Sequence, residues 1–152
     1  MRNKTLKKLK ILLVEDEEKL ATLLKDAIGD NFHSFTLACD GEDGLEKFSD
    51  ISPDIVITDI TMTKMTGLEM SQKIKNINRK VPIRILSALI ETDKFLNAID
   101  IGVMKYFIKP IDPDELLEYI SSISENFASK LIELEEDFSF NLTSNNICTL
   151  YV

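Results

Sequence analysis

The sequence predicts an α/β fold built on a doubly wound parallel sheet, and three observations support this prediction. Short apolar, β-branched runs alternate along the chain with segments whose apolar residues recur at helical spacing. Most of the short runs have a continuous apolar centre without regular alternation of polar residues, which is typical of strands buried on both faces. Strands that alternate with helices are joined by right-handed crossovers, which place helices on both faces of one parallel sheet. The length of 152 residues suits one such domain with a short appendage.

Five strands are expected. The four continuous apolar runs lie at Lys10–Val14, Asp54–Thr58, Pro82–Ser87 and Lys105–Ile108. A weaker run at Ser34–Cys39 fits a strand nearer the edge of the sheet. Because a helical pattern separates each run from the next, all five strands are expected to be parallel.

Five helices are expected between and after these strands. The first follows the i, i+3, i+4, i+7, i+8 pattern from Leu20 to Ile28, and Gly29 suits its end. The fifth opens at Asp112–Glu115 with a capping aspartate, a proline at the first helical position and acids in the first turn. The three middle helices are marked by Leu45 and Phe48, by Leu68, Ile74 and Ile77, and by Phe95, Ala98, Ile99 and Gly102.

Charge and composition exclude several classes of protein. The 18 basic and 26 acidic side chains give a net charge of −8, which argues against a general binder of nucleic acids or anionic membranes. No run approaches the ~18 apolar residues that a membrane span requires. The two cysteines, Cys39 and Cys148, indicate no disulfide framework and favour a cytoplasmic protein.

Polar side chains follow the predicted strands at their carboxyl ends. Glu15 and Asp16 follow the first strand, Asp59 follows the third and Lys109 the fifth. The fourth strand ends in Ser87. In a doubly wound sheet the functional crevice lies at this edge. Taken singly, each residue could cap a helix or point into solvent. Together, three carboxylates, a hydroxyl and an ammonium predict a site for a hard cation and a phosphate group, with Mg²⁺ as the preferred ion.

These residues also suggest a reaction. The carboxylate of Asp59 could act as a nucleophile and form an acyl phosphate. The metal and Lys109 would then neutralise charge on the phosphoryl oxygens, and Ser87 would donate a hydrogen bond to the phosphate.

Six stretches of the chain form a set of motifs that occur in order on the predicted elements: Ile11–Glu17, Ala38–Glu42, Pro53–Asp59, Met65–Glu69, Leu86–Ala88 and Tyr106–Pro110. With these motifs the chain resembles the receiver domain of two-component response regulators over residues 8–126. The resemblance implies a flavodoxin-like sheet with strand order 2-1-3-4-5. It also implies a phospho-accepting switch and not an enzyme, beyond weak self-phosphorylation and autodephosphorylation.

The resemblance implies how phosphate and metal are held. Asp59 would be the phospho-acceptor, taking phosphate from a histidine kinase or a phosphotransfer protein. Glu15 and Asp16 would hold Mg²⁺ together with Asp59 and the backbone carbonyl of Thr61. Lys109, followed by a proline in a cis peptide, would pair with the phosphate.

It also implies how the signal is passed on. Ser87 would rotate toward the phosphate and Tyr106 would turn inward behind it, a population shift between two states. A homodimer through the fourth helix, fifth strand and fifth helix is expected.

Three positions depart from the family pattern. Thr63 stands where the family usually has proline, and Thr66 stands where an acid often precedes the glycine. Both are expected to loosen the loop after Asp59. Arg84 interrupts the otherwise apolar fourth strand. Either it lies near the start of the strand, or its long side chain extends so that the charge reaches solvent.

Other chemistries fit less well. A haloacid dehalogenase-type phosphatase needs a second aspartate two residues after the nucleophile, where Thr61 stands instead. The glycine-rich signatures of P-loop and dinucleotide sites are absent from the sequence. The remaining alternative is a stand-alone receiver or a pseudo-receiver that acts by protein–protein interaction without DNA output.

The last residues suggest a link to an output domain. Residues 127–137 are predicted to be an acidic linker that extends the fifth helix, and residues 138–152 show a β-hairpin pattern. This pattern is similar to the opening sheet of an OmpR-type winged-helix output domain. We therefore expect the receiver of a transcription regulator that lacks most of its output domain, with no DNA binding by this chain alone.

Overall fold

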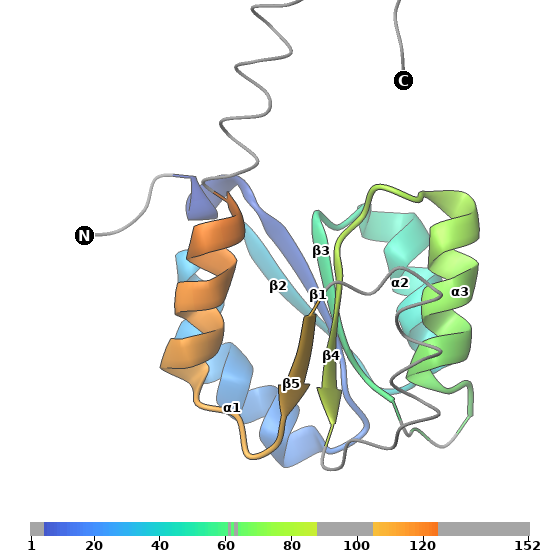
Figure 1. Cartoon of the computed structure of the whole chain (residues 1–152), viewed down its shortest axis with the longest axis horizontal. Coiled ribbons are helices and arrows are strands. Elements are labelled where there is room, and N and C mark those ends of the chain that lie inside the picture. The colour runs from blue at the N-terminus through green and yellow to red at the C-terminus, as the bar shows by residue number, and fades with distance from the viewer. Residues whose placement is uncertain (1–4, 61, 63, 88–104, 125–152) are drawn as a thin grey trace, which may run out of the picture.

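Five parallel strands form one sheet in the order β2-β1-β3-β4-β5 (Figure 1). The structure is a computed structural model of the chain, and it describes residues 5–60, 62, 64–87 and 105–124. The doubly wound parallel sheet and its predicted strand order are confirmed. The strands are β1 (Lys10–Val14), β2 (Ser34–Ala38), β3 (Ile55–Asp59), β4 (Ile83–Ser87) and β5 (Lys105–Ile108).

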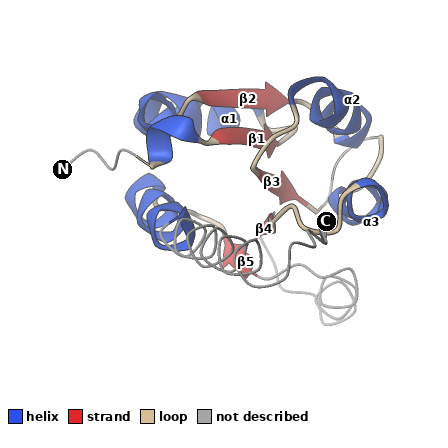
Figure 2. Ribbon diagram, turned by 90° about the horizontal axis from the view of Figure 1, so that it is seen from above, coloured by secondary structure: helices blue, strands red, loops and turns tan. Residues whose placement is uncertain are grey.

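Helices cover both faces of the sheet (Figure 2). Helix α1 (Glu18–Ile28) lies on one face with the helix formed by residues 113–124, and α2 (Gly41–Ile51) lies on the other with α3 (Gly67–Ile77). Asp112 caps the helix at 113–124, since its Oδ1 accepts from the N–H of Asp114 at 2.9 Å. None of the described helices is long and apolar enough to cross a membrane.

The apolar strands are buried on both faces because side chains alternate along a strand. In β1, Ile11 and Leu13 join the core under α1, whereas Leu12 and Val14 join the core under α2 and α3. All four side chains are fully buried. This two-sided burial explains why the strands appear in the sequence as continuous apolar runs and not as alternating ones.

The chain before β1 contains a structured turn that the sequence analysis did not predict. A 3-10 helix, η1 (Leu6–Lys8), places Leu6 in the core with Phe32 and Ile120. A second short helix, η2 (Gly29–Asn31), continues α1 by one turn past its expected end. The basic N-terminal run therefore carries one core residue among its lysines.

Arg84 is buried in the sheet, with a relative exposure of 2%. It is the second residue of β4, so it lies near the start of the strand, and the interpretation that its charge reaches solvent is wrong. Its Nη1 donates to the carbonyl of Ile83 at 3.0 Å, and its guanidinium carbon lies 5.4 Å from the ring centroid of Tyr119. The charge is held by an aromatic face and not by water.

Three predicted elements lie outside the described residues. They are the fourth helix marked by Phe95 and Ile99, the helix extension at 127–137 and the hairpin at 138–152. The predicted bounds of the five strands agree with the structure to within one residue at each end.

Candidate functional site

Three carboxylates meet at the carboxyl edge of the sheet. Strands β1 and β3 pair in parallel with Val14 opposite Thr58, so the residues that follow these two are brought together. Those residues are Glu15, Asp16 and Asp59, each with a carboxylate oxygen within 4.8 Å of the others. Glu15 and Asp59 are buried, while Asp16 is exposed at the mouth of the cluster. The arrangement offers a cation three ligands and one open side.

Lys109 reaches this cluster from the end of β5. Its Nζ lies 3.0 Å from Oε2 of Glu15 and 3.3 Å from Oδ2 of Asp59. The Lys109–Pro110 peptide is cis, as the family resemblance implies. The side chain extends past β4, which lies between β5 and β3. One ammonium is therefore shared by two buried carboxylates.

The charges in this cluster shift one another's protonation. Burial raises the pKa of Glu15, and the negative charge of Asp59 adds to this effect, although Lys109 opposes it. Burial acts to lower the pKa of Lys109, but its contacts with Glu15 and Asp59 outweigh burial and raise that pKa above its usual value. Lys109 thus stays charged at neutral pH, and a single positive charge does not offset three carboxylates.

The two carboxylate oxygens of Asp59 have different surroundings. Oδ1 accepts a hydrogen bond of 2.7 Å from the backbone N–H of Ile60. Oδ2 faces the ammonium of Lys109 at 3.3 Å. The side chain is therefore fixed in rotation, and one oxygen is distinguished from the other before any ligand arrives.

The loop after Asp59 is tied to the start of α3. A Cβ on Gly67 would lie 1.7 Å from the carbonyl oxygen of Asp59, so only glycine fits at this close approach. The N–H of Gly67 donates to the carbonyl of Ile60 at 2.8 Å. Thr66, which we expected to loosen the loop, is the N-cap of α3 and accepts from the N–H of Glu69 at 3.2 Å.

The remaining predicted residues are placed only in part. Ser87 is the last residue of β4 and its backbone pairs with Ile108, and the backbone of Tyr106 pairs with Ile85. The side chains of Ser87 and Tyr106, and the whole of Thr61 and Thr63, lie outside the described part of the structure. Their roles stay predictions.

Thr58 was not among the predicted site residues. This residue interrupts the apolar run of β3 with a hydroxyl group directly before Asp59, and it is fully buried. This hydroxyl could have been identified from the sequence, because a polar group in a buried strand needs a hydrogen-bond partner.

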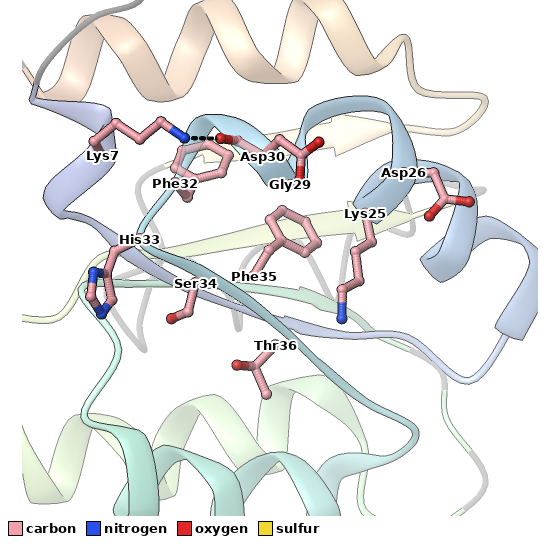
Figure 3. A pocket seen from close by; sticks show the side chains of 10 residues that line it. All are labelled: Lys7, Lys25, Asp26, Gly29, Asp30, Phe32, His33, Ser34, Phe35 and Thr36. Carbon is pink, nitrogen blue, oxygen red and sulfur yellow. Dashed lines mark hydrogen bonds between the residues drawn. The ribbon is translucent and has the colours of Figure 1, made fainter.

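A hollow of about 640 Å³ lies elsewhere, beside the edge strand β2 and the end of α1 (Figure 3). Its polar side chains do not converge: Lys25 and His33 point away from one another, and Lys7 donates to the carbonyl of Asp30. The acidic cluster at the carboxyl edge is the better candidate for a functional site.

Comparison with known proteins agrees with this geometry. Residues 11–121 match the family model described as the response regulator receiver domain. The chain belongs to this family. Receiver domains are switches that bind Mg²⁺ at an acidic site and interact with histidine kinases or phosphotransfer proteins.

Two curated relatives are regulators, and the match covers about half of the length of each. The transcriptional regulatory protein DltR of Streptococcus agalactiae is 35% identical over 112 residues, which are 74% of this chain and 50% of DltR. The response regulator ArlR of Staphylococcus aureus is 34% identical over 113 residues, which are 74% of this chain and 51% of ArlR. The chain thus spans about half the length of the curated relatives it matches.

Solved structures show the same receiver fold. The N-terminal domain of an uncharacterized protein of Wolinella succinogenes is 38% identical, with a TM-score of 0.76 over 80% of this chain and 98% of that one. The chemotaxis protein CheY4 of Vibrio cholerae is 24% identical, with a TM-score of 0.70 over 76% of this chain and 98% of that one, and is similar in fold alone.

Proposed function

We propose that Asp59 is the phospho-acceptor of this receiver domain and takes phosphate from a histidine kinase or a phosphotransfer protein. The observation that supports this most directly is the position of Lys109, whose ammonium lies between Glu15 and Asp59 at the carboxyl edge of the sheet. An ammonium 3.3 Å from the carboxylate can stabilise the negative charge of a phosphoryl group that is transferred to it.

The reaction uses the oxygen of Asp59 that faces Lys109. Oδ2 attacks the phosphorus of a phosphohistidine, a P–O bond forms, and the P–N bond to the histidine breaks. The leaving imidazole takes up a proton, and Asp59 becomes an acyl phosphate. Lys109 stays protonated and neutralises part of the charge on the phosphoryl oxygens. Ser87 is proposed to donate a hydrogen bond to the same group.

The acidic cluster suits a magnesium ion. Glu15, Asp16 and Asp59 place three carboxylates together with one ammonium. Burial raises the pKa of Glu15, and the charge of Asp59 adds to this effect. Mg²⁺ prefers one or two carboxylates with oxygen ligands of other kinds. We propose that these residues and the backbone carbonyl of Thr61 hold Mg²⁺, which supplies positive charge for the transferring phosphoryl group.

We propose that phosphorylation is read on the side of the sheet that carries β4 and β5. Ser87 and Tyr106 are the proposed switch residues, and a homodimer through the fourth helix, β5 and the fifth helix is the proposed active form. The receiver is assigned to residues 8–126, followed by an acidic linker at 127–137 and a hairpin of a winged-helix output domain at 138–152. This switch is proposed to control transcription in the cytoplasm, because DltR, a relative of this receiver, is a transcriptional regulatory protein.

Labelling with a small phosphodonor tests the proposed acceptor. Wild type, Asp59→Asn and Asp54→Asn are incubated with radiolabelled acetyl phosphate and Mg²⁺. Asp54 is the matched control, because it lies at the opposite edge of the sheet, where its carboxylate accepts from the N–H of Lys10. Wild type and Asp54→Asn should incorporate label, and Asp59→Asn should not.

Two other results would contradict the proposal. Label on Asp59→Asn at the wild-type level would mean that another residue accepts the phosphate. A wild-type chain that takes no label and binds no beryllofluoride with Mg²⁺ would be a pseudo-receiver.

A further inference from the structure

A buried hydroxyl lies next to the proposed phospho-acceptor. Thr58 is fully buried and lies on the same face of the sheet as Val56, in the apolar layer beneath α2 and α3. Leaving a hydroxyl without a hydrogen bond in such a layer is costly. Its Oγ1 donates to the carbonyl oxygen of Asp59 at 2.9 Å.

The same peptide group also holds the carboxylate of Asp59. The peptide between Asp59 and Ile60 accepts the Thr58 hydroxyl at its oxygen and donates from its N–H to Oδ1 of Asp59 at 2.7 Å. A donor on the carbonyl polarises a peptide and strengthens its N–H as a donor. The hydroxyl of Thr58 therefore acts on the carboxylate through one rigid, planar group.

The first turn of α3 packs against the same carbonyl group of Asp59. Gly67 lies against the carbonyl of Asp59, and its N–H donates to the carbonyl of Ile60 at 2.8 Å. The hydroxyl of Ser71, also fully buried, donates to the carbonyl of Gly67 at 2.6 Å. The peptide after Asp59 thus has little room to rotate.

We propose that Thr58 is a positioning residue for phosphorylation, which aims Oδ2 of Asp59 at the incoming phosphorus by holding Oδ1 through the Asp59–Ile60 peptide. This inference rests on the proposed function of Asp59. Orientation of a nucleophile is worth a measurable part of a reaction barrier. Thr58 itself touches neither the donor nor the phosphate.

The test compares three variants with wild type. Thr58→Val keeps the shape of the side chain and removes the hydroxyl, and Thr58→Ser keeps the hydroxyl and removes a methyl group. Thr36→Val is the matched control, because it makes the same change in β2, on a half-buried residue away from the site. The labelling rate is measured against acetyl phosphate concentration at saturating Mg²⁺, together with the thermal midpoint of each variant.

Loss of one hydrogen bond predicts that Thr58→Val lowers the maximal labelling rate by roughly three- to ten-fold, with the concentration for half-maximal rate unchanged. Thr58→Ser should stay within about two-fold of wild type, since the donor is kept. A purely structural role would lower the thermal midpoint and leave the rate unchanged. Thr58→Val at the wild-type rate, or Thr58→Ser as slow as Thr58→Val, would overturn the inference.

A second measurement separates this inference from the proposed function. In ¹H–¹⁵N spectra without phosphate, the amide proton of Ile60 should shift upfield in Thr58→Val and stay in place in Thr36→Val, because its hydrogen bond weakens. An unmoved Ile60 amide overturns the inference even if Asp59 is labelled. A shifted amide in a chain that takes no label supports the contact and contradicts the function. Should Thr58→Val not fold, Thr58→Cys, a weak donor of similar size, takes its place in both measurements.

Discussion

The ammonium of Lys109 lies 3.0 Å from Oε2 of Glu15, whose side chain is wholly buried. The same Nζ lies 3.3 Å from Asp59. Both contacts cross from the end of β5 to carboxylates at the ends of β1 and β3, so one cation ties three strands together. Stability and phosphorylation are therefore expected to depend on the same side chain.

Lys109→Met tests this dependence. In metal-free buffer at pH 7 the free energy of unfolding should fall by up to about 3 kcal/mol, because two buried carboxylates lose their partner. Labelling of Asp59 by acetyl phosphate should fall by roughly 100-fold, since a charge that stabilises the transferring group is gone. Urea unfolding and radiolabelling measure the two effects.

Lys47→Met is the control for this experiment. Lys47 also forms an ion pair at 3.0 Å, with Asp43, but its side chain is 37% exposed. Exposed pairs contribute about 1 kcal/mol or less. Equal losses of stability in the two variants would show that the buried Lys109 pair contributes no more to the free energy of unfolding than an exposed pair does.

Glu15→Gln tests the protonation of the cluster. Burial, together with the charge of Asp59, raises the pKa of Glu15 in the folded state above its unfolded value. Between those two values the folded chain keeps a proton that the unfolded chain has released. The contribution of Glu15 to stability is therefore present below the unfolded value and lost as pH rises through the folded value. Without Mg²⁺, wild type should lose stability relative to Glu15→Gln as pH rises from about 4.5 toward neutrality.

Urea unfolding of both chains in EDTA, from pH 4.5 upward, measures this difference. The comparison cancels the titration of groups that the two chains share. A wild-type chain that gains stability relative to Glu15→Gln over this range would mean that Lys109 holds Glu15 fully ionised.

The sheet could be predicted from the sequence because strands buried on both faces appear as continuous apolar runs. Strand β1, for example, is apolar from Ile11 to Val14, and such continuous runs are typical of parallel strands that are covered by helices on both faces. The sequence was not sufficient for η1, where Leu6 is a single core residue among lysines and no periodicity marks it. Arg84 was ambiguous for a similar reason: its partner is the ring of Tyr119, a contact that sequence spacing does not indicate.

The part of the candidate site that could be predicted from the sequence consists of residues directly at the ends of strands. Parallel strands bring their carboxyl ends to one edge, so Glu15, Asp16 and Asp59 could be placed together without coordinates. The backbone contacts could not be foreseen. The N–H of Ile60 and the hydroxyl of Thr58 act through local geometry at the end of β3, where the direction of one peptide decides which oxygen is held.

Asp16→Asn separates metal binding from folding. Asp16 is exposed, so its loss should change stability without metal by no more than about 0.5 kcal/mol. Mg²⁺ at about 100 times its dissociation constant should stabilise wild type by about 2.7 kcal/mol, and Asp16→Asn should lose most of this gain at the same concentration. Glu17→Gln changes the next exposed acid and should keep the gain. Thermal midpoints with and without Mg²⁺ measure it, and an equal gain in all three chains would remove Asp16 from the metal site.

Gly67→Ala tests the packing of α3 against the phospho-acceptor. The new Cβ would lie 1.7 Å from the carbonyl oxygen of Asp59, and this backbone atom cannot move without moving the peptide that holds the carboxylate. Overpacking of this kind costs about 1–3 kcal/mol, and we expect labelling of Asp59 to slow with it. In Gly29→Ala the Cβ would meet its neighbours at 3.4 Å on helical backbone with φ of −58°, so stability should stay equal or rise by about 0.5 kcal/mol. If Gly67→Ala has the same free energy of unfolding and the same labelling rate as Gly29→Ala, the contact between α3 and Asp59 does not position the acceptor.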